Sequence, residues 1–329
     1  MSTPGHLSPT QGDDPGPDVK PQDVVVLVNT KSRRGELWFE QVVEGLKARG
    51  VTIAHAEAFE KPKDLFARAQ QMVKERRKYI VLGGGDGTFS GSARMFDGSD
   101  SILGVLPLGT GNAFARDLGI ATDVDAACDV IAAGNVEHVD MALAGGKPFI
   151  NVATIGLTVG IAKNLNPEEK KILGPLAYAT SLMRSLATIK PFEATITLDG
   201  KSETFRSLQV VVGNGRFHAG PFLLAPDADI ASGQLVAYGL NSTNKADFLR
   251  LGWHLVRGTQ LEMENVVHLY GQSGKLEANP PQRVILDGEL SGATPLELGI
   301  KPGALRVLAP PAAVRLAEAE VVEEKPVQG

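Results

Sequence analysis

The strongest chemical signal in this chain is a first glycine turn, Gly83-Gly84-Gly85-Asp86-Gly87-Thr88, which follows the apolar run Tyr79–Leu82. Consecutive glycines let a backbone turn sharply and come close to a bulky anion. The free N–H groups at the start of a following helix favour negative charge there. A carboxylate such as Asp86 in the same turn is typical of a site that also holds a metal ion or a transferable proton. The turn therefore predicts a nucleoside triphosphate site with chemistry.

A second glycine turn, Pro107-Leu108-Gly109-Thr110-Gly111-Asn112, follows the apolar run Ile102–Leu106. Its place after a neighbouring strand resembles that of the first turn, so the two turns together could hold two parts of one nucleotide. The alternative is local, because Thr110 or Asn112 could simply cap the next helix. Beside the first turn, nucleotide binding is the favoured interpretation.

A third group, which we call the acidic segment, is Leu286-Asp287-Gly288-Glu289. In an extended strand Asp287 and Glu289 would point to the same face. Paired carboxylates raise each other's proton affinity, which suits a general base. The alternative is a solvated turn, since Asp-Gly is a common hairpin pair.

A polar loop, residues 29–35, follows the first apolar run of the chain. Asn29 and Lys31 could reach phosphate oxygens from the carboxyl end of a strand. A plain polar loop explains the same residues equally well.

The elements that must position these groups follow from the apolar pattern. Up to about residue 142, short apolar runs alternate with segments of helical spacing, which predicts a parallel α/β sheet with its ligand at the carboxyl ends of the strands. Beyond it, alternating runs predict an antiparallel β domain with two helices, within Pro167–Lys190 and from Lys245 to Arg257. The sequence therefore predicts four parts: a disordered tail (1–21), a nucleotide domain (22–142, completed by 302–312), a β domain (143–301) and a second tail (313–329).

Composition excludes several classes of protein. The chain has 329 residues and a net charge of −5, with no long basic run, which argues against a nucleic-acid binder. Its single cysteine, Cys128, excludes an internal disulfide and disfavours a thiolate metal site. No apolar stretch approaches the roughly 18 residues of a membrane span, and no signal peptide is evident. We expect a cytoplasmic protein that meets lipid only at the membrane surface.

The two glycine turns and the acidic segment, in this order and spacing, resemble the diacylglycerol kinase catalytic-domain family. The resemblance is greatest to its soluble bacterial lipid kinases and more distant to sphingosine and ceramide kinases. NAD kinases are similar at the first turn, but the other two motifs separate them. Further matches are His138-Val139-Asp140-Met141-Ala142, Phe149-Ile150-Asn151 and Gly213-Asn214-Gly215. The likeness runs from about residue 22 to 310.

The resemblance implies a Rossmann-like nucleotide domain followed by a β-sandwich domain, with the active site in the cleft between them. It implies transfer of phosphate from ATP, with Mg²⁺, to a lipid hydroxyl. Asp86 and Thr88 would hold phosphates and metal, and Thr110 would contact the nucleotide. Glu289, with Asp287 beside it, would take the hydroxyl proton. Asp140 would belong to a supporting hydrogen-bond network.

This chain departs from the family pattern at three places, one of which is His218-Ala219-Gly220, where the family commonly has a glycine triplet near Asn214. Asn112 is followed by Ala113 where the family often has aspartate, so a carboxylate is missing unless Asp117 substitutes. In the loop that often holds a structural Mg²⁺, the candidate ligands are Asp229, Ser232 and Gln234. Ser232 stands in place of an aspartate and is a weak ligand for a hard cation, so tight binding is not expected unless Asp227 or Asp229 compensates.

The leading hypothesis is therefore an ATP-dependent lipid kinase acting on diacylglycerol or a similar lipid, giving phosphatidic acid or its equivalent. The alternatives are a kinase of a soluble substrate, such as NAD, and a lipid- or nucleotide-binding module without turnover. Peripheral membrane contact could come from a basic helical surface with Lys163, Lys170, Lys171 and Arg184, although an ordinary amphipathic helix packed on the β domain explains these residues too. A homodimer is left open.

Overall fold

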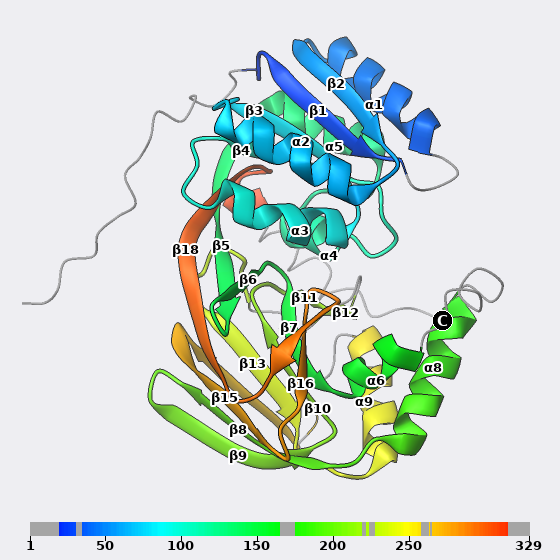
Figure 1. Cartoon of the computed structure of the whole chain (residues 1–329), viewed down its shortest axis with the longest axis vertical. Helices are drawn as coiled ribbons and strands as arrows, with labels where there is room; N and C mark the ends of the chain where they lie inside the picture. The colour runs from blue at the N-terminus through cyan, green and yellow to red at the C-terminus, as the bar shows by residue number, and fades with distance from the viewer. Residues whose placement is uncertain are drawn as a thin grey trace, which may run out of the picture.

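The computed structural model describes residues 20–30, 35–164, 175–218, 222–223, 228–257, 263 and 265–314. The predictions for most of the two tails, for Lys31, Lys170 and Lys171, and for Asp227 fall outside these residues, as does the side chain of Lys163. The described chain forms an upper and a lower body, and two strands, β5 and β18, run between them (Figure 1). The expected α/β domain with a β-sandwich is confirmed.

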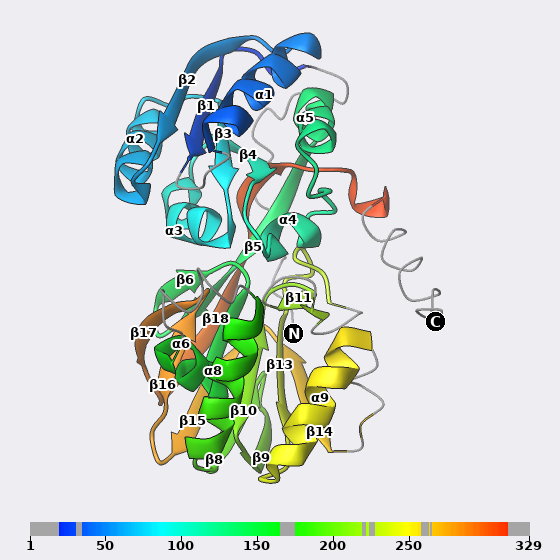
Figure 2. The same cartoon turned by 90° about the vertical axis from the view of Figure 1, so that its right-hand side faces the viewer.

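The upper body is built on a parallel sheet with strand order β2-β1-β3-β4. Every residue of β3 and β4 is buried, as continuous apolar runs require in a sheet covered on both faces. Helices α2 and α3 cover one face, and α1 and α5 cover the other (Figures 1 and 2). The elements are β1 (Val24–Asn29), α1 (Gly35–Ala48), β2 (Ile53–Phe59), α2 (Pro62–Lys74), β3 (Tyr79–Gly84), α3 (Asp86–Phe96), β4 (Ile102–Pro107), α4 (Ala113–Asp117) and α5 (Val124–Ala133).

The lower body packs an antiparallel sheet, β14-β13-β10-β7-β16-β17, against strands that continue the upper sheet. The apolar core between these layers is separate from the core of the upper body. The elements are β5 (Val136–Ala144), β6 (Lys147–Phe149), β7 (Val152–Gly156), α6 (Leu157–Asn164), α8 (Pro175–Thr188), β8 (Phe192–Leu198), β9 (Lys201–Ser207), β10 (Gln209–Gly213), β11 (Phe217–His218), β12 (Phe222–Leu223), β13 (Leu235–Leu240), α9 (Lys245–Arg257), β14 (Val266–Gly271), β15 (Ser273–Asn279), β16 (Arg283–Leu286), β17 (Glu289–Ala293) and β18 (Leu296–Leu308).

Strand β18 joins the two bodies into one continuous sheet. It pairs with β15 near its start and in parallel with β4 at its end, where Val307 lies opposite Leu103. Along most of its length it also pairs with β5. The nucleotide turns and the lower body are thus connected through hydrogen-bonded strands, which fixes the position of the cleft between them.

One alternating run of the sequence predicts a single strand, and this prediction is wrong. The apolar run Phe205–Val212 is two strands, β9 and β10, which belong to different sheets. The chain crosses at Leu208, whose carbonyl accepts a hydrogen bond from the N–H of Leu157 at 2.9 Å. The Ser207 hydroxyl donates to the carbonyl of Leu240 at 2.8 Å. A strand that changes sheets must give up its own ladder at the crossing, and these two bonds replace it.

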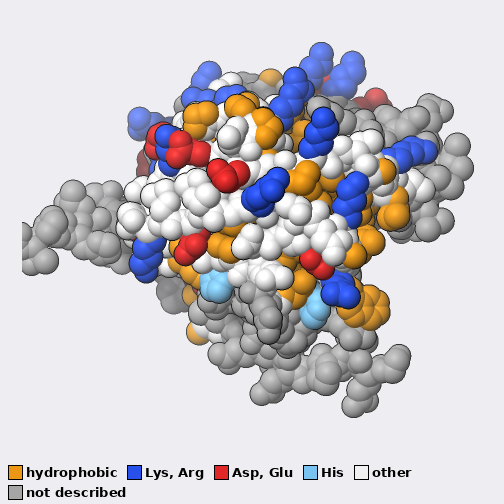
Figure 3. All heavy atoms as spheres, turned by 90° about the horizontal axis from the view of Figure 1, so that it is seen from below, with side chains coloured by type: hydrophobic (Ala, Val, Ile, Leu, Met, Phe, Trp, Pro, Cys, Tyr) orange, Lys and Arg blue, Asp and Glu red, His pale blue; other side chains and the backbone are white. Residues whose placement is uncertain are grey.

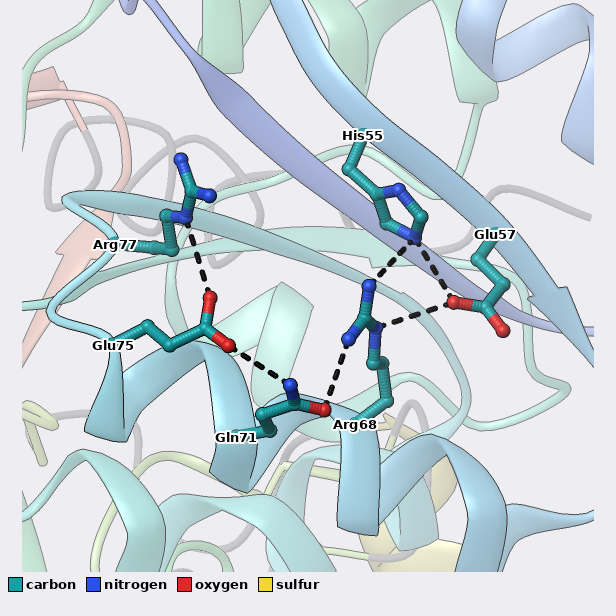
Figure 4. A network of polar contacts seen from close by, with 6 residues as sticks. All are labelled: His55, Glu57, Arg68, Gln71, Glu75 and Arg77. Atoms are coloured by element: carbon teal, nitrogen blue, oxygen red, sulfur yellow. Dashed lines mark hydrogen bonds and ion pairs between the residues drawn. The ribbon is translucent and has the colours of Figure 1, made fainter.

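A polar network fastens α2 to the edge strand β2, away from the glycine turns (Figure 4). Arg68 lies 3.3 Å from the Glu57 carboxylate and also donates to Gln71 at 2.9 Å. Glu57 in turn lies 2.9 Å from the His55 ring, and Gln71 donates to Glu75 at 2.8 Å. Exposed pairs of this kind contribute about 1 kcal/mol or less each. Charged side chains on an edge strand also discourage pairing with another chain.

Candidate active site

The two glycine turns lie against each other, backbone to backbone. The N–H of Leu108 donates to the carbonyl of Gly84 at 2.8 Å. A Cβ added at Gly109 would overlap the Cα of Gly85. Because β3 and β4 are parallel neighbours, both turns leave the same edge of the sheet. The structure therefore brings together the two motifs that the sequence placed side by side.

Within the first turn, the side chain of Thr88 packs inside the protein and is not exposed at the surface. Its side chain is buried, and a Cβ at Gly84 would overlap its hydroxyl. Asn29, at the end of β1, approaches the same hydroxyl, with its Nδ2 at 3.4 Å. Thr88 and Asn29 therefore hold the backbone of the first turn in place, and their expected contacts with phosphate stay predictions.

Gly87 differs from its neighbours because a Cβ there would meet nothing within 4 Å. It lies in the first turn of α3, where the helix N–H groups face outward and attract an anion. Open space over a helix N-terminus is the room that a phosphate group needs. Gly87 therefore marks the side on which a ligand would approach.

Gly87→Val is expected to raise the KM for the nucleotide by about tenfold or more, since the new side chain would fill the space next to the helix N–H groups. Unfolding in urea should stay within about 0.5 kcal/mol of wild type, because valine is the better helix former. Gly252→Val is the matched control, as Gly252 is also a helical glycine with open space around it. Equal effects of both substitutions on KM would contradict a ligand at Gly87.

In the second turn, Asn112 has a structural role. It adopts a left-handed conformation with φ of 53° and is 2% exposed. Its Oδ1 accepts from the N–H of Gly109 at 3.0 Å, and its Nδ2 donates to the carbonyl of Gly109 at 2.9 Å. Its side chain makes no helix-capping bond. Asn112 therefore closes the glycine turn on itself and does not cap α4, while its expected contact with a nucleotide stays a prediction.

Thr110 is exposed and lines a cavity of about 300 Å³ beside the second turn. Trp38 from α1 and Arg116 from α4 line the same cavity, together with Asp123 at the start of α5. The Arg116 guanidinium is held by the carbonyl of Gly111 at 3.3 Å. Sequence reasoning missed Trp38 and Arg116, because each stands alone in its helix and belongs to no motif.

The acidic segment is a hairpin turn between β16 and β17. Asp287 and Gly288 both have positive φ, 45° and 91°, and Leu286 pairs with Glu289 across the turn. Positive φ at both central residues is the geometry of a two-residue hairpin. The expectation that Asp287 and Glu289 share one face of an extended strand is therefore wrong, because Asp287 lies in the turn itself.

Asp287 is nevertheless not a solvated turn residue. Its carboxylate accepts three backbone N–H groups, from Ile150, Asn151 and Val152, each at 2.9 Å. Burial raises the pKa of Asp287 to about 6, against the lowering effect of these N–H groups. Glu289 lies exposed at the head of β17. The two carboxylates therefore have different surroundings, Asp287 anchoring the hairpin and Glu289 facing outward.

Asp86 and Asp287 lie near each other, although they come from different bodies. The Asp86 carboxylate adds to the upward shift of the pKa of Asp287, which requires the two groups to lie close together. Asp86 accepts the N–H of Phe114 at 3.2 Å, and burial raises its pKa as well. The first glycine turn and the acidic segment, far apart in the chain, are therefore near enough for their carboxylates to interact electrostatically.

The raised pKa of Asp287 predicts a pH dependence of stability. An aspartate titrates near 3.9 in an unfolded chain and this one near 6 in the fold, so the protonated form stabilises the fold below about pH 4 and that stabilisation is lost as the pH rises through 6. Between pH 4 and 7, the free energy of unfolding of wild type should fall by up to about 3 kcal/mol relative to that of Asp287→Asn. Urea unfolding at several pH values measures this difference. A difference that stays constant over this range would contradict the buried carboxyl.

Two further aspartates bridge the bodies. Asp140 accepts the N–H groups of Gly233 at 2.6 Å and Gly303 at 2.8 Å. Asp117 accepts the N–H of Arg216 at 2.7 Å and is 1% exposed. Asp140 thus occupies a hydrogen-bond network of the kind that was expected. Asp117 ties α4 to the segment after β10 and does not lie in the turn that lacks a carboxylate.

The loop of the candidate structural metal is closed by its own hydrogen bonds. The Asp229 carboxylate accepts the N–H of Ala231 at 2.8 Å, and the Ser232 hydroxyl accepts the N–H of Gln234 at 3.3 Å. Within the part of the chain that the structure describes, no group of three or more His, Cys, Asp or Glu residues could hold a metal ion. Asp229, Ser232 and Gln234 therefore remain a predicted ligand set.

Profiles of two known domains match this chain. The diacylglycerol kinase catalytic domain matches residues 23–144, and the YegS C-terminal NAD kinase beta sandwich-like domain matches residues 152–309. "Probable lipid kinase YegS" of Salmonella arizonae is 30% identical over 300 or so residues, covering 88% of this chain and 96% of that protein. The chain belongs to the diacylglycerol kinase family.

Other family members agree with this assignment. "Diacylglycerol kinase" of Bacillus subtilis is 30% identical over 66% of this chain and 73% of its own length. The crystal structure of a diacylglycerol kinase from Bacillus anthracis superposes with a TM-score of 0.72 at 25% identity, covering 88% of this chain and 98% of that one. The chain also spans 62% of the length of "Uncharacterized protein sll0036" of Synechocystis, at 30% identity.

Membership in this kinase family makes the chain a phosphotransferase of the lipid kinase group. The roles expected of Asp86, Asp287 and Glu289 in phosphoryl transfer remain predictions. None of the helices formed by the described residues has both the length and the apolar character needed to cross a bilayer.

Proposed function

We propose that this chain transfers the γ-phosphate of ATP to a hydroxyl group of a membrane lipid, diacylglycerol or a similar molecule. The observation that carries the proposal is the electrostatic interaction of Asp86 with Asp287, which brings the first glycine turn near the hairpin that also bears Glu289. Phosphoryl transfer depends on positioning and charge neutralisation more than on covalent work by the protein. Open space at Gly87 in the first glycine turn, with acidic side chains nearby, suits that requirement.

The residues present fit a nucleotide with a metal ion. The open space at Gly87 leaves room for phosphate groups, and the cavity at Thr110 and Trp38 could take the base. Two buried acceptors beside Asp287, Asn151 Oδ1 and Asn214 Oδ1, have no hydrogen-bond donor within the described chain. Orphaned oxygens next to carboxylates suit a hydrated hard cation. Mg²⁺ would supply neutralisation of the phosphate charge when bound.

In this arrangement the two acidic residues of the hairpin have separate tasks. Asp287 fixes the turn by accepting three N–H groups of the segment before β7. Glu289 follows it and is exposed, so it can meet the hydroxyl of an incoming lipid and take its proton. The Gly85–Thr88 backbone orients the phosphate that the hydroxyl attacks.

A cavity with a partly apolar lining, which also includes Lys275 and Glu297, favours a lipid over a soluble acceptor. It has a volume of about 390 Å³ and adjoins the hairpin. Leu286 lines it and pairs directly with Glu289, so both side chains leave the same face of the sheet. Its other lining residues include Val284, Ala293 and Leu296. A hydroxyl held at Glu289 could therefore continue into an acyl chain held by this cavity.

The test is an assay with γ-labelled ATP over a lipid extract, followed by extraction into organic solvent. Label in the organic phase supports the lipid kinase, and mass spectrometry of that product identifies the lipid. Label that stays in a new water-soluble product would identify a kinase of a soluble substrate. No transferred label with any acceptor would leave a binding module and overturn the proposal.

Ala293→Phe should narrow this cavity beside the hairpin from its edge. We expect the KM for long-chain lipids to rise by about tenfold or more, while short-chain analogues are phosphorylated as before. The matched control is Ala67→Phe, an exposed alanine on α2. A chain-length profile of Ala293→Phe that equals the profile of wild type would mean that the acyl chain lies elsewhere.

A further inference from the structure

Large apolar side chains are exposed on two neighbouring helices of the lower body. Met183 of α8 is 57% exposed, and Leu249 and Trp253 of α9 are 46% and 58% exposed. Among the described residues, these are three of the six exposed large hydrophobic side chains. Leu249 and Trp253 are four positions apart, so they lie on one side of α9. We call this surface the α8–α9 face.

The packing of both helices explains why this face is outward. Leu186 of α8 and Phe248 and Leu251 of α9 are buried against the antiparallel sheet. The Lys245 ammonium donates to the carbonyl of Ala187 at 2.9 Å, which joins the start of α9 to the last turn of α8. Both helices lie over the sheet (Figure 2). The sides of the helices that face the sheet are already packed by other apolar residues, so the outer apolar side chains are not needed for the fold.

The charges around the exposed apolar side chains are mainly positive. Arg184, Lys190, Lys245 and Arg250 are exposed on or beside the two helices. The nearby Asp247 accepts the Ser242 hydroxyl at 2.6 Å and lies 3.8 Å from Arg250. The lower end of this body likewise shows more Lys and Arg than Asp and Glu (Figure 3). This local excess contrasts with the net charge of −5 for the whole chain.

We propose that the α8–α9 face docks on an anionic lipid bilayer, with Met183, Leu249 and Trp253 inserted at the headgroup level. Exposed apolar side chains flanked by Lys and Arg are the pattern of helices that lie in a membrane interface. Tryptophan is particularly suited to this depth because it has an apolar body and one polar N–H. The inference rests on the proposed function, since it names the partner that presents the lipid substrate.

The experiment measures binding to vesicles without ATP. Wild type should cosediment with vesicles of phosphatidylcholine and phosphatidylglycerol, and less with phosphatidylcholine alone or in high salt. The vesicle-bound fraction of Met183→Glu/Leu249→Glu should correspond to a partition coefficient at least about tenfold lower than that of wild type. Burial of one large apolar side chain is worth that factor or more. The matched control is Leu37→Glu/Val314→Glu, which changes two exposed apolar residues of the upper body and should bind like wild type.

A spectroscopic readout locates the contact. The chain has two tryptophans, so in Trp38→Phe the only emission comes from Trp253. Its emission should shift to shorter wavelength when anionic vesicles are added. An unchanged spectrum, or equal vesicle binding by both double variants, would overturn the inference. A dimer in sedimentation velocity that Met183→Glu/Leu249→Glu alone converts to a monomer would also overturn it, in favour of a second copy of this chain.

Failure of the docking inference and failure of the proposed function are distinguishable. In detergent micelles with dispersed lipid, Met183→Glu/Leu249→Glu should phosphorylate as wild type does, because neither residue belongs to the active site. If wild type turns over lipid in micelles but does not bind vesicles, only the docking face is wrong. If wild type binds vesicles but transfers no phosphate, only the kinase proposal is wrong.

Discussion

Glu289→Gln is expected to lower kcat by about 10²- to 10⁴-fold, the usual loss when a general base is removed. Glutamine has the same shape as glutamate but cannot take a proton from the lipid hydroxyl. Glu289 is exposed at the first position of β17, so the fold does not depend on its charge. Transfer of labelled phosphate to lipid measures the rate, and urea unfolding should remain at the wild-type midpoint.

Two comparisons make this result specific to position 289. Glu193→Gln changes an exposed glutamate on β8, in the same body, and should leave kcat unchanged. The affinity of Glu289→Gln for the nucleotide should also be unchanged, because the phosphate site lies on the glycine turns. A fully active Glu289→Gln enzyme would remove the proposed base and would move attention to the other carboxylates of the cleft.

The sequence predicted the neighbourhood of the two glycine turns for a sound physical reason. Apolar runs that alternate with helical spacing give parallel strands, and the ends of adjacent parallel strands lie at one edge. The contact between Gly85 and Gly109 follows from that rule. The structural role of Asn112 does not follow from that rule. A left-handed residue that bonds to its own turn cannot be recognised from residue type alone.

The acidic segment shows the limit of pattern reasoning more clearly. Both the hairpin and the strand were compatible with Leu286–Glu289, and the hairpin is correct. Yet the residues that bury Asp287 come from 150–152, more than 130 positions away. A carboxylate that accepts three distant N–H groups looks the same in sequence as one in a solvated turn.

The apolar pattern of the sequence predicts only the end of the long strand β18, at Ala304–Leu308. Its first half carries exposed and partly exposed residues and a proline, so local pattern gives little support for a strand. Pairing with β5, β15 and β4 overrides that weak local preference. The cavity between Trp38 and Arg116 has a similar origin, since α1 must pack near α4 and the start of α5, which lie far from it in sequence, before the cavity exists.

Asp86→Asn is expected to lower kcat by at least about 100-fold, since stabilisation of phosphate charge by a bound cation is worth several kcal/mol. Asparagine keeps an oxygen that can accept the N–H of Phe114, so the link between α3 and α4 is retained. What is lost is the negative charge beside the phosphate site. Labelled phosphate transfer measures the loss, and Asp64→Asn, an exposed aspartate in the first turn of α2, is the matched control.

The same substitution has a second consequence that needs no turnover. The Asp86 carboxylate contributes to the raised pKa of Asp287, so its neutralisation should lower that pKa from about 6. The pH at which the fold loses the stabilisation of protonated Asp287 should then move down, as seen by urea unfolding across pH 4 to 7. If Asp86→Asn abolishes transfer without moving this transition, Asp86 acts on the nucleotide alone. If the transition moves, the two carboxylates share one cleft, and the acidic segment is held where the phosphate must arrive.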